Sequence, residues 1–232
     1  TVIFVMNHRS NMDYVLVTYL AAQRSALSYA VGEWARVWPL SWLIRSMGAY
    51  FIRRRSDGAL YRRVLSRYVQ MATAEGVTQA IFPEGGLSLD GRTGPARLGL
   101  LSYIVQAPLA AGQDVVFVPV ALSYDRIVED RVLIAAHKAG TRRFRAPLGA
   151  ILAFVLRHVW RALLGRFRGF GMAVVRFGPP ISLTEFTRGR EGDVTAPLAE
   201  HLMAVIDRTI PVLAVPLVSA AWGQGAATDR AA

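Results

Sequence analysis

The sequence predicts an α/β fold, a single domain in which a mainly parallel β-sheet is flanked by helices. Two observations lead to this prediction. Short apolar runs rich in β-branched residues, typical of buried strands, alternate with amphipathic stretches at helical spacing. Polar clusters directly follow several of these runs, as expected where parallel strands end beside a ligand site. We expect this domain to span residues 1–222 and residues 223–232 to form a disordered tail.

Composition narrows the class of protein. The chain of 232 residues is long enough for one large α/β domain. It has no cysteine, which excludes a disulfide framework, a thiolate nucleophile and a zinc–thiolate site. No charged segment followed by an apolar one opens the chain, so we predict no signal peptide. Because Thr1 leads directly into a predicted strand, we expect a fragment or a processed chain.

The net charge of +11 is concentrated in one segment. Residues 131–184 hold ten of the 27 basic residues and none of the 16 acidic ones, so this segment carries +10 and the remainder +1. Together with 53% hydrophobic residues, this distribution favours an anionic membrane surface as partner. Nucleic acid is not expected, because its binding sites interleave basic residues with exposed aromatic and polar side chains.

The first predicted strand, residues 2–6, leads into the candidate catalytic pair. His8 follows the strand, and Asp13 stands early in a predicted helix over residues 13–24. A turn from strand to helix can bring the carboxylate back to the imidazole, which makes a general base with a fixed tautomer. The alternative is structural, with His8 in the turn and Asp13 favoured by the helix dipole.

A short strand over residues 27–31 and a tryptophan-rich stretch come next. The stretch over residues 33–47 should form two helical pieces, because Pro39 interrupts it. Its tryptophans at four-residue spacing either pack in the core or form an interfacial belt or acyl-chain wall; they are Trp34, Trp38 and Trp42.

Arginines follow the next predicted strand, residues 49–52. Arg53 and Arg54 can bind a phosphate through the planar guanidinium fork, or they can belong to a solvated loop. An amphipathic helix over residues 57–75 should then turn its apolar side chains inward and its arginines outward. The inward set is Leu60, Val64, Leu65, Tyr68 and Met71, and the outward set is Arg62, Arg63 and Arg67.

A glycine pair follows the predicted strand over residues 77–82. Gly85 and Gly86 permit a nest of N–H groups that faces an anion, and Glu84 could accept from a substrate hydroxyl or pair with a basic residue. The alternative is a tight turn with a solvated glutamate. A helix over residues 98–111 should follow.

Four further elements are expected after that helix. A buried strand over residues 114–124 contains Pro119, which restricts its pairing. We then expect a short strand over residues 132–136, a strand over residues 171–177 and a helix over residues 198–210.

The basic segment contains an apolar run over residues 146–156, which is too short to span a bilayer. Arginines then alternate with apolar residues, as in an interfacial helix whose arginines extend to the headgroups. They are Arg157, Arg161, Arg166 and Arg168. The alternative is an amphipathic helix packed on the domain.

Four motifs occur in order along residues 2–130: His8 to Tyr14, Gly48 to Arg54, Phe82 to Gly86, and Val118 to Val120. This series resembles the glycerolipid acyltransferases, and especially the bacterial glycerol-3-phosphate acyltransferases. The resemblance implies direct acyl transfer from acyl-CoA or acyl-carrier protein to glycerol 3-phosphate, the first step of phospholipid synthesis. It assigns His8 as general base and Asp13 as its orienting partner. The substrate-binding residues that it implies are Ser10, Arg53, Arg54, Glu84, Gly85, Gly86, Arg92 and Pro119.

The sequence departs from this family at Leu87, where an arginine usually follows the glycine pair. Arg92 or Arg97 could supply the missing charge. Three alternatives therefore stay open: another acceptor such as lysophosphatidate, another lysolipid or dihydroxyacetone phosphate; a hydrolase; or a non-catalytic membrane-surface module. We expect no metal and no cofactor beyond the acyl donor, and a peripheral location at the cytoplasmic face of the cell membrane.

Overall fold

The computed structural model describes residues 1–21, 28–32, 42, 48–52, 58–140, 156–157, 160–161, 163–166, 169 and 171–228. The chain divides into two compact units. The first comprises residues 1–87, 93–122 and 175–211, and the second comprises residues 88–92, 123–174 and 212–232. The first unit holds most of the sheet and all of the contacts from which the candidate site is built below.

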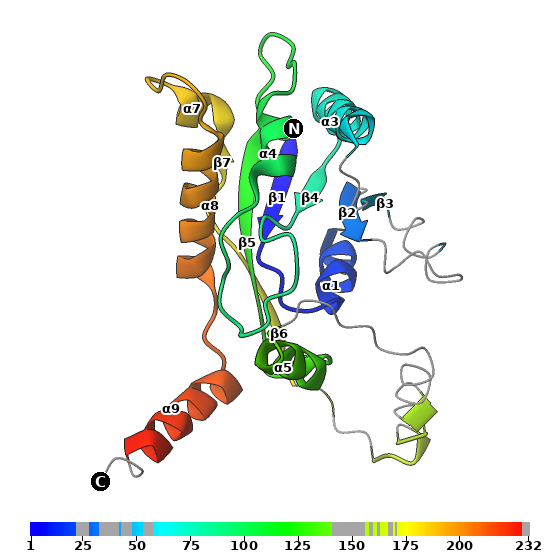
Figure 1. Ribbon diagram of the computed structural model, residues 1–232, viewed down its shortest axis with the longest axis vertical. Helices are drawn as coiled ribbons and strands as arrows, with labels where there is room; N and C mark the ends of the chain where they lie inside the picture. Colours follow the sequence, from blue (N-terminus) through cyan, green and yellow to red (C-terminus); the bar gives the residue numbers. More distant parts are fainter. Residues whose placement is uncertain are drawn as a thin grey trace. The chain divides into compact units, whose positions relative to one another are not determined.

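A sheet in the order β3-β2-β4-β1-β5-β6 organises the fold, with β7 paired to β5 (Figure 1). From β3 through β2, β4 and β1 to β5, each strand is parallel to the next, whereas β7 is antiparallel to β5. The strands are β1 (Val2–Met6), β2 (Ser28–Gly32), β3 (Ala49–Ile52), β4 (Gln79–Ile81), β5 (Val116–Tyr124), β6 (Ala173–Phe177) and β7 (Ile181–Ser182). The predicted α/β class with a mainly parallel sheet is therefore confirmed.

Helices cover the sheet of the first unit. Ile3 and Val5 of β1 share one hydrophobic core with side chains from four of the described helices, α3, α4, α7 and α8. Val17 of α1 is buried outside that core, as expected when right-handed crossovers that run in opposite directions along the sheet place their helices on opposite faces. The helices of this unit are α1 (Met12–Ala21), α3 (Ala59–Ala74), α4 (Leu98–Val105), α7 (Leu183–Thr187) and α8 (Thr195–Thr209).

The connections that follow β1 and β4 run in opposite directions along the sheet. These two strands are parallel neighbours, with Val5 opposite Ile81. The chain leaves β1 toward α1 and leaves β4 toward α4, so the connections diverge. Such a switch point leaves a crevice beyond the carboxyl ends of the strands. His8 and Glu84 follow these two strands and lie at this switch point.

One predicted strand is a helix. Residues 132–136 lie in α5 (Asp130–Lys138) of the second unit. A short apolar run does not distinguish a strand from a helix, but Leu133 and Ala136 are the buried positions, three residues apart as on a helix face. Asp130 in the first turn and Lys138 in the last also suit the helix dipole.

Helix α3 turns a different face to the core than the sequence predicted. Its buried residues are Val69 and Thr73, and Leu65 packs against the core. The other four residues predicted to point inward are exposed: Leu60, Val64, Tyr68 and Met71. The apolar stripe was identified correctly, but its direction was wrong, because Val69 and Thr73 fill the space below the helix instead.

Smaller differences concern element ends. The helix predicted over residues 98–111 ends at Val105, since Pro108 disfavours helical geometry before it. Ile181 and Ser182 form the short strand β7, and the Ser182 hydroxyl accepts the Glu185 N–H to cap α7. In the second unit, α9 (Ala214–Thr228) includes residues 223–228, which were predicted to be disordered.

Candidate active site

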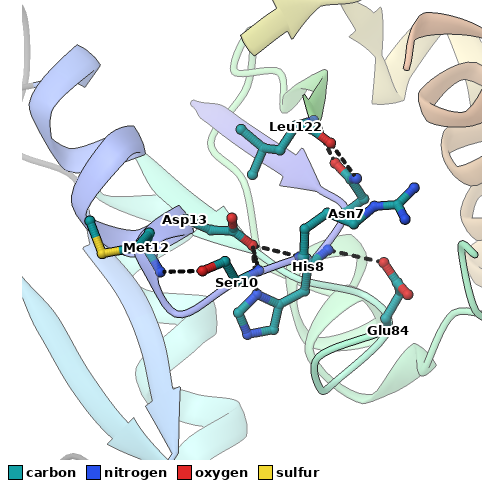
Figure 2. A network of polar contacts seen from close by, with 8 residues as sticks. Asn7, His8, Ser10, Met12, Asp13, Glu84 and Leu122 are labelled. Carbon is teal, nitrogen blue, oxygen red and sulfur yellow. Dashed lines mark hydrogen bonds and ion pairs between the residues drawn. The ribbon is translucent and has the colours of Figure 1, made fainter. Parts of the chain in front are cut away.

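The site is built from two turns that follow neighbouring parallel strands. The turn after β1 carries His8, and the turn after β4 carries Glu84 (Figure 2). His8, Asp13 and Glu84 are all buried. Because the two strands are in register, their carboxyl ends bring these turns together although 76 residues of chain separate His8 from Glu84.

His8 and Asp13 form the predicted pair. His8 Nδ1 lies 2.9 Å from Asp13 Oδ2. A carboxylate oxygen only accepts hydrogen bonds, so Nδ1 carries the proton of the neutral imidazole and Nε2 is the nitrogen that can take one. The His8 ring also packs on Phe82, with ring centroids 4.4 Å apart, which fixes its plane. The pair has the geometry of a general base with an orienting carboxylate.

The turn between β1 and α1 is shaped by the same carboxylate. Asp13 Oδ2 also accepts the backbone N–H groups of Arg9, at 2.7 Å, and Ser10, at 3.0 Å. The Ser10 hydroxyl in turn accepts the Met12 N–H at 3.1 Å, where α1 begins. A side-chain acceptor two or three residues before a helix amide is the usual helix N-cap. The local sequence therefore holds Asp13 under His8 by capping the helix.

Glu84 connects the two turns. Its Oε1 accepts the His8 N–H at 3.0 Å, and its Oε2 accepts the Gly94 N–H at 2.9 Å. With only 7% of its surface exposed, Glu84 is held between the turn of His8 and the base of the loop that follows the glycine pair. This geometry gives Glu84 a positioning function toward His8. Its predicted contact with a substrate hydroxyl stays a prediction.

Asn7 is a positioning residue that sequence reasoning missed. Its side-chain amide donates to the Leu122 carbonyl at 3.0 Å, and its carbonyl accepts the Leu122 N–H at 2.7 Å. All of these groups are buried. The side chain thus continues the pairing of β1 with β5 beyond Met6 and fixes the point at which His8 leaves the sheet. A polar residue directly after a buried strand was the available signal.

The two glycines of the pair differ in their surroundings. Gly85 has a φ of +65°, and a Cβ built on it would lie 2.6 Å from Cδ of Arg97. The positive φ favours glycine at this position, and the Arg97 side chain would have to move to admit any larger residue. A Cβ on Gly86 would meet nothing within 4 Å. The side chain of Arg97 therefore lies against the turn that holds Glu84, and the Arg97 N–H donates to the Pro83 carbonyl at 2.7 Å.

Pro119 lies inside β5, opposite Val5 of β1. Its carbonyl accepts the Gly178 N–H at 2.8 Å, on the side of the strand that faces the gap between β6 and β7. The N–H that proline lacks would point to the same side, so the pairing of β5 with β1 loses no hydrogen bond.

Other predicted residues belong to the second unit or lie outside the described residues. Arg92 belongs to the second unit, where its N–H donates to Asp90 and its carbonyl accepts the Ser88 hydroxyl. Arg157, Arg161 and Arg166 are exposed in the same unit. Five predicted residues lie outside the described part of the chain: Arg53, Arg54, Arg168, Trp34 and Trp38. Trp42, the third tryptophan of the predicted set, is exposed.

Comparison with known proteins bears on this arrangement. The model of the acyltransferase family matches residues 1–123, which hold His8, Asp13 and Glu84. The chain belongs to the acyltransferase family. The predicted resemblance is thereby confirmed, and all four motifs lie within the matched residues.

Relatives of this acyltransferase chain carry a common name. Glycerol-3-phosphate acyltransferases of Alteromonas mediterranea and Aeromonas hydrophila are 30% and 31% identical to it over 189 residues, which is 80% of this chain. The enzyme of that name from Pseudomonas syringae pv. tomato is 32% identical over 196 residues, or 83% of this chain. The chain spans about a fifth of the length of these relatives, 22% in each case.

A solved structure shares the fold. The 1-acyl-sn-glycerophosphate (LPA) acyltransferase PlsC of Thermotoga maritima superposes with a TM-score of 0.51 at 19% sequence identity. The match covers 90% of this chain and 64% of the other.

Proposed function

We propose that this acyltransferase chain moves an acyl group from a thioester donor, acyl-CoA or acyl-carrier protein, to the hydroxyl of glycerol 3-phosphate. The observation that supports this best is the buried contact of 2.9 Å between His8 Nδ1 and Asp13 Oδ2 at the ends of parallel strands. The name shared by the relatives supports the acceptor.

The reaction needs no covalent enzyme intermediate. His8 Nε2 takes the proton of the acceptor hydroxyl as the oxygen attacks the carbonyl carbon of the thioester. The tetrahedral intermediate collapses with loss of the thiolate, which recovers the proton from the imidazolium. Asp13 keeps the imidazole in the required tautomer and stabilises its charged form. The products are the ester and the free thiol, and His8 returns to its starting state.

The phosphate of the acceptor requires cationic partners. Arg53 and Arg54 follow the end of β3 and are proposed for this task, as the sequence motif implies. Arg97 is a further candidate, since its side chain lies against Gly85 in the turn that holds Glu84. The charge of Arg97 would then compensate for the arginine that the family usually has at the position of Leu87.

An acylation assay with several acceptors tests this function. Glycerol 3-phosphate should be used in preference to glycerol, lysophosphatidate, dihydroxyacetone phosphate and water. Arg97→Gln should raise the KM for glycerol 3-phosphate about tenfold or more and leave the KM of the donor unchanged, because a charge-assisted hydrogen bond is lost. Arg208→Gln, at an exposed position in the last turn of α8, is the matched control. Preferred use of lysophosphatidate would show that it, and not glycerol 3-phosphate, is the acceptor. Release of free fatty acid would indicate a hydrolase.

We also propose that the protein works at the cytoplasmic face of the cell membrane as a peripheral protein. No single described helix is long and apolar enough to cross a bilayer; only α8 and the first part of α9, a bent pair, meet that condition together. The apolar side chains of α8 lie in the core. In the basic segment, exposed arginines alternate with exposed Leu156, Trp160, Leu163 and Leu164, a composition that suits the lipid interface.

A further inference from the structure

Helix α3 presents an apolar stripe that does not pack on the protein core. Its exposed members are Leu60, Val64, Tyr68 and Met71, with exposed fractions of 77%, 59%, 48% and 52%. Their spacing of three and four residues places them along one side of the helix. Val69 and Thr73, on the opposite side, are fully buried. Tyr68 touches the Tyr50 ring edge-on, with centroids 5.1 Å apart, and the rest of the stripe extends beyond this contact.

Two arginines border this stripe. At 100° per residue, Arg63 and Arg67 follow one edge of it, and both are exposed. Helix α3 contains no aspartate or glutamate. An exposed apolar stripe with a row of arginines along its edge matches the boundary between acyl chains and anionic headgroups, where the arginine stems lie on apolar surface and the guanidinium groups reach the phosphates.

The start of α3 lies near the edge of the sheet that carries the candidate site. In the order β3-α3-β4, the start of the helix follows the carboxyl end of a parallel strand. The carboxyl ends of the strands form the same edge of the sheet from which His8 and Glu84 project. Leu60 and Arg63 therefore stand at the end of α3 that is nearer to the catalytic edge.

We propose that the exposed face of α3, defined by Leu60, Arg63, Val64, Arg67, Tyr68 and Met71, docks on an anionic phospholipid surface. The charge of the face selects this partner, because two cations without a neighbouring acid in the helix favour a negatively charged surface. Docking brings the lipid interface to the edge of the sheet at which the acyl ester is made. This last step rests on the proposed function, whereas the docking itself does not.

The lack of cysteine permits a direct test. Val64→Cys provides a unique site for an environment-sensitive fluorophore, and Glu200→Cys, at an exposed position on α8, provides the matched control. With vesicles of phosphatidylglycerol and phosphatidylcholine, the label at position 64 should shift to the blue and be quenched by spin-labelled lipid. The label at position 200 should respond to neither. Vesicles of phosphatidylcholine alone should give a much weaker response.

Variants of the face complete the test. Arg63→Gln with Arg67→Gln should weaken binding to the anionic vesicles about tenfold or more, since each such charge contributes about fivefold at the surface. Val64→Ser with Met71→Ser should weaken it similarly, while circular dichroism remains that of the parent. Equal responses at positions 64 and 200 would overturn the proposal. A protein-concentration-dependent shift at position 64 without lipid, together with a dimer in light scattering, would assign the face to a second copy instead. Vesicle binding by a parent that transfers no acyl group would overturn the proposed function and leave the lipid face standing.

Discussion

Glu84 Oε1 accepts the backbone N–H of His8 at 3.0 Å, so a carboxylate from the end of β4 holds the residue that follows β1. Asp13 holds the same histidine from the other side through its ring, at 2.9 Å. The backbone and the imidazole of His8 are thus fixed by two different carboxylates. This division of tasks leads to different expectations for the three side chains.

His8→Ala should abolish acyl transfer without unfolding the protein. A positioned general base contributes on the order of 10²–10⁴ in rate, so the loss should appear in kcat rather than in KM. Asp13→Asn should be less severe, because His8 keeps its ring but loses its orienting acceptor. His201→Ala, on the exposed side of α8, serves as the control histidine. Retention of more than about a tenth of the activity by His8→Ala would exclude it as the base.

Glu84→Gln should lower kcat about 10- to 100-fold, with little change in the KM of either substrate. The amide oxygen of glutamine can replace one carboxylate oxygen as acceptor. Its NH₂ group is a donor, however, and would face the second backbone N–H, so the turn that holds His8 should shift. Steady-state kinetics against Asp90→Asn, an exposed carboxylate that also accepts a backbone N–H, measures the effect. A rise in the KM of the acceptor at unchanged kcat would instead show that Glu84 binds the substrate.

Asn7→Ala should destabilise the fold by about 2–4 kcal/mol, because the buried N–H and carbonyl of Leu122 lose their partners together. Urea unfolding gives this difference in the free energy of unfolding. Gln113→Ala is a suitable control, since that exposed amide accepts a single N–H from Ala110, and it should cost less than about 1 kcal/mol. Equal costs for the two variants would contradict a stabilising role of Asn7.

Asp114 should make stability depend on acid pH. Burial raises the pKa of this carboxyl, but hydrogen bonds from Ser182, Thr184 and Val115 outweigh it and hold the pKa below its ordinary value of 3.8. A carboxyl whose pKa is lowered in the folded state stabilises the protein at pH values above its pKa in the unfolded state. This contribution disappears as the pH falls through the pKa of the folded state.

Asp114→Asn should therefore cost roughly 1 kcal/mol at pH 7, a figure that allows for the partial exposure of the site. The cost should shrink when urea unfolding is repeated at pH 3. A cost that is the same at both pH values would assign the effect to shape and hydrogen bonding rather than to the charge.

The basic segment offers a separate expectation. Replacement of Arg157, Arg161, Arg166 and Arg168 by Gln should release the protein from anionic vesicles in sedimentation experiments, because each such charge contributes about 1 kcal/mol at a lipid surface. Transfer from short, soluble acyl donors should be largely unchanged. Undiminished sedimentation of this variant would identify the segment as an ordinary packed helix and would leave α3 or α9 to contact the lipid.

The alternation of apolar runs and helical stretches was enough to predict β1, β3, β5 and α8 and the parallel sheet. These elements are determined by local composition, because a short run of β-branched residues between polar turns has few other ways to bury its surface. The same local logic found His8 and Asp13, which are five residues apart and meet within one turn. It failed for α5, where a run of five apolar residues fits a helix as well as a strand.

Sequence alone indicated the candidate residues His8 and Asp13 and the places along the chain where most of the turns occur. Only the tertiary structure decided that Glu84 and Gly94 hold the turn of His8, that Asn7 pairs with Leu122 across 115 residues, and that the apolar stripe of α3 faces outward. Periodicity shows that one side of a helix is apolar but does not tell which neighbour covers it. Contacts between distant segments depend on strand order and register, and these are set by the packing of the whole sheet rather than by any local pattern.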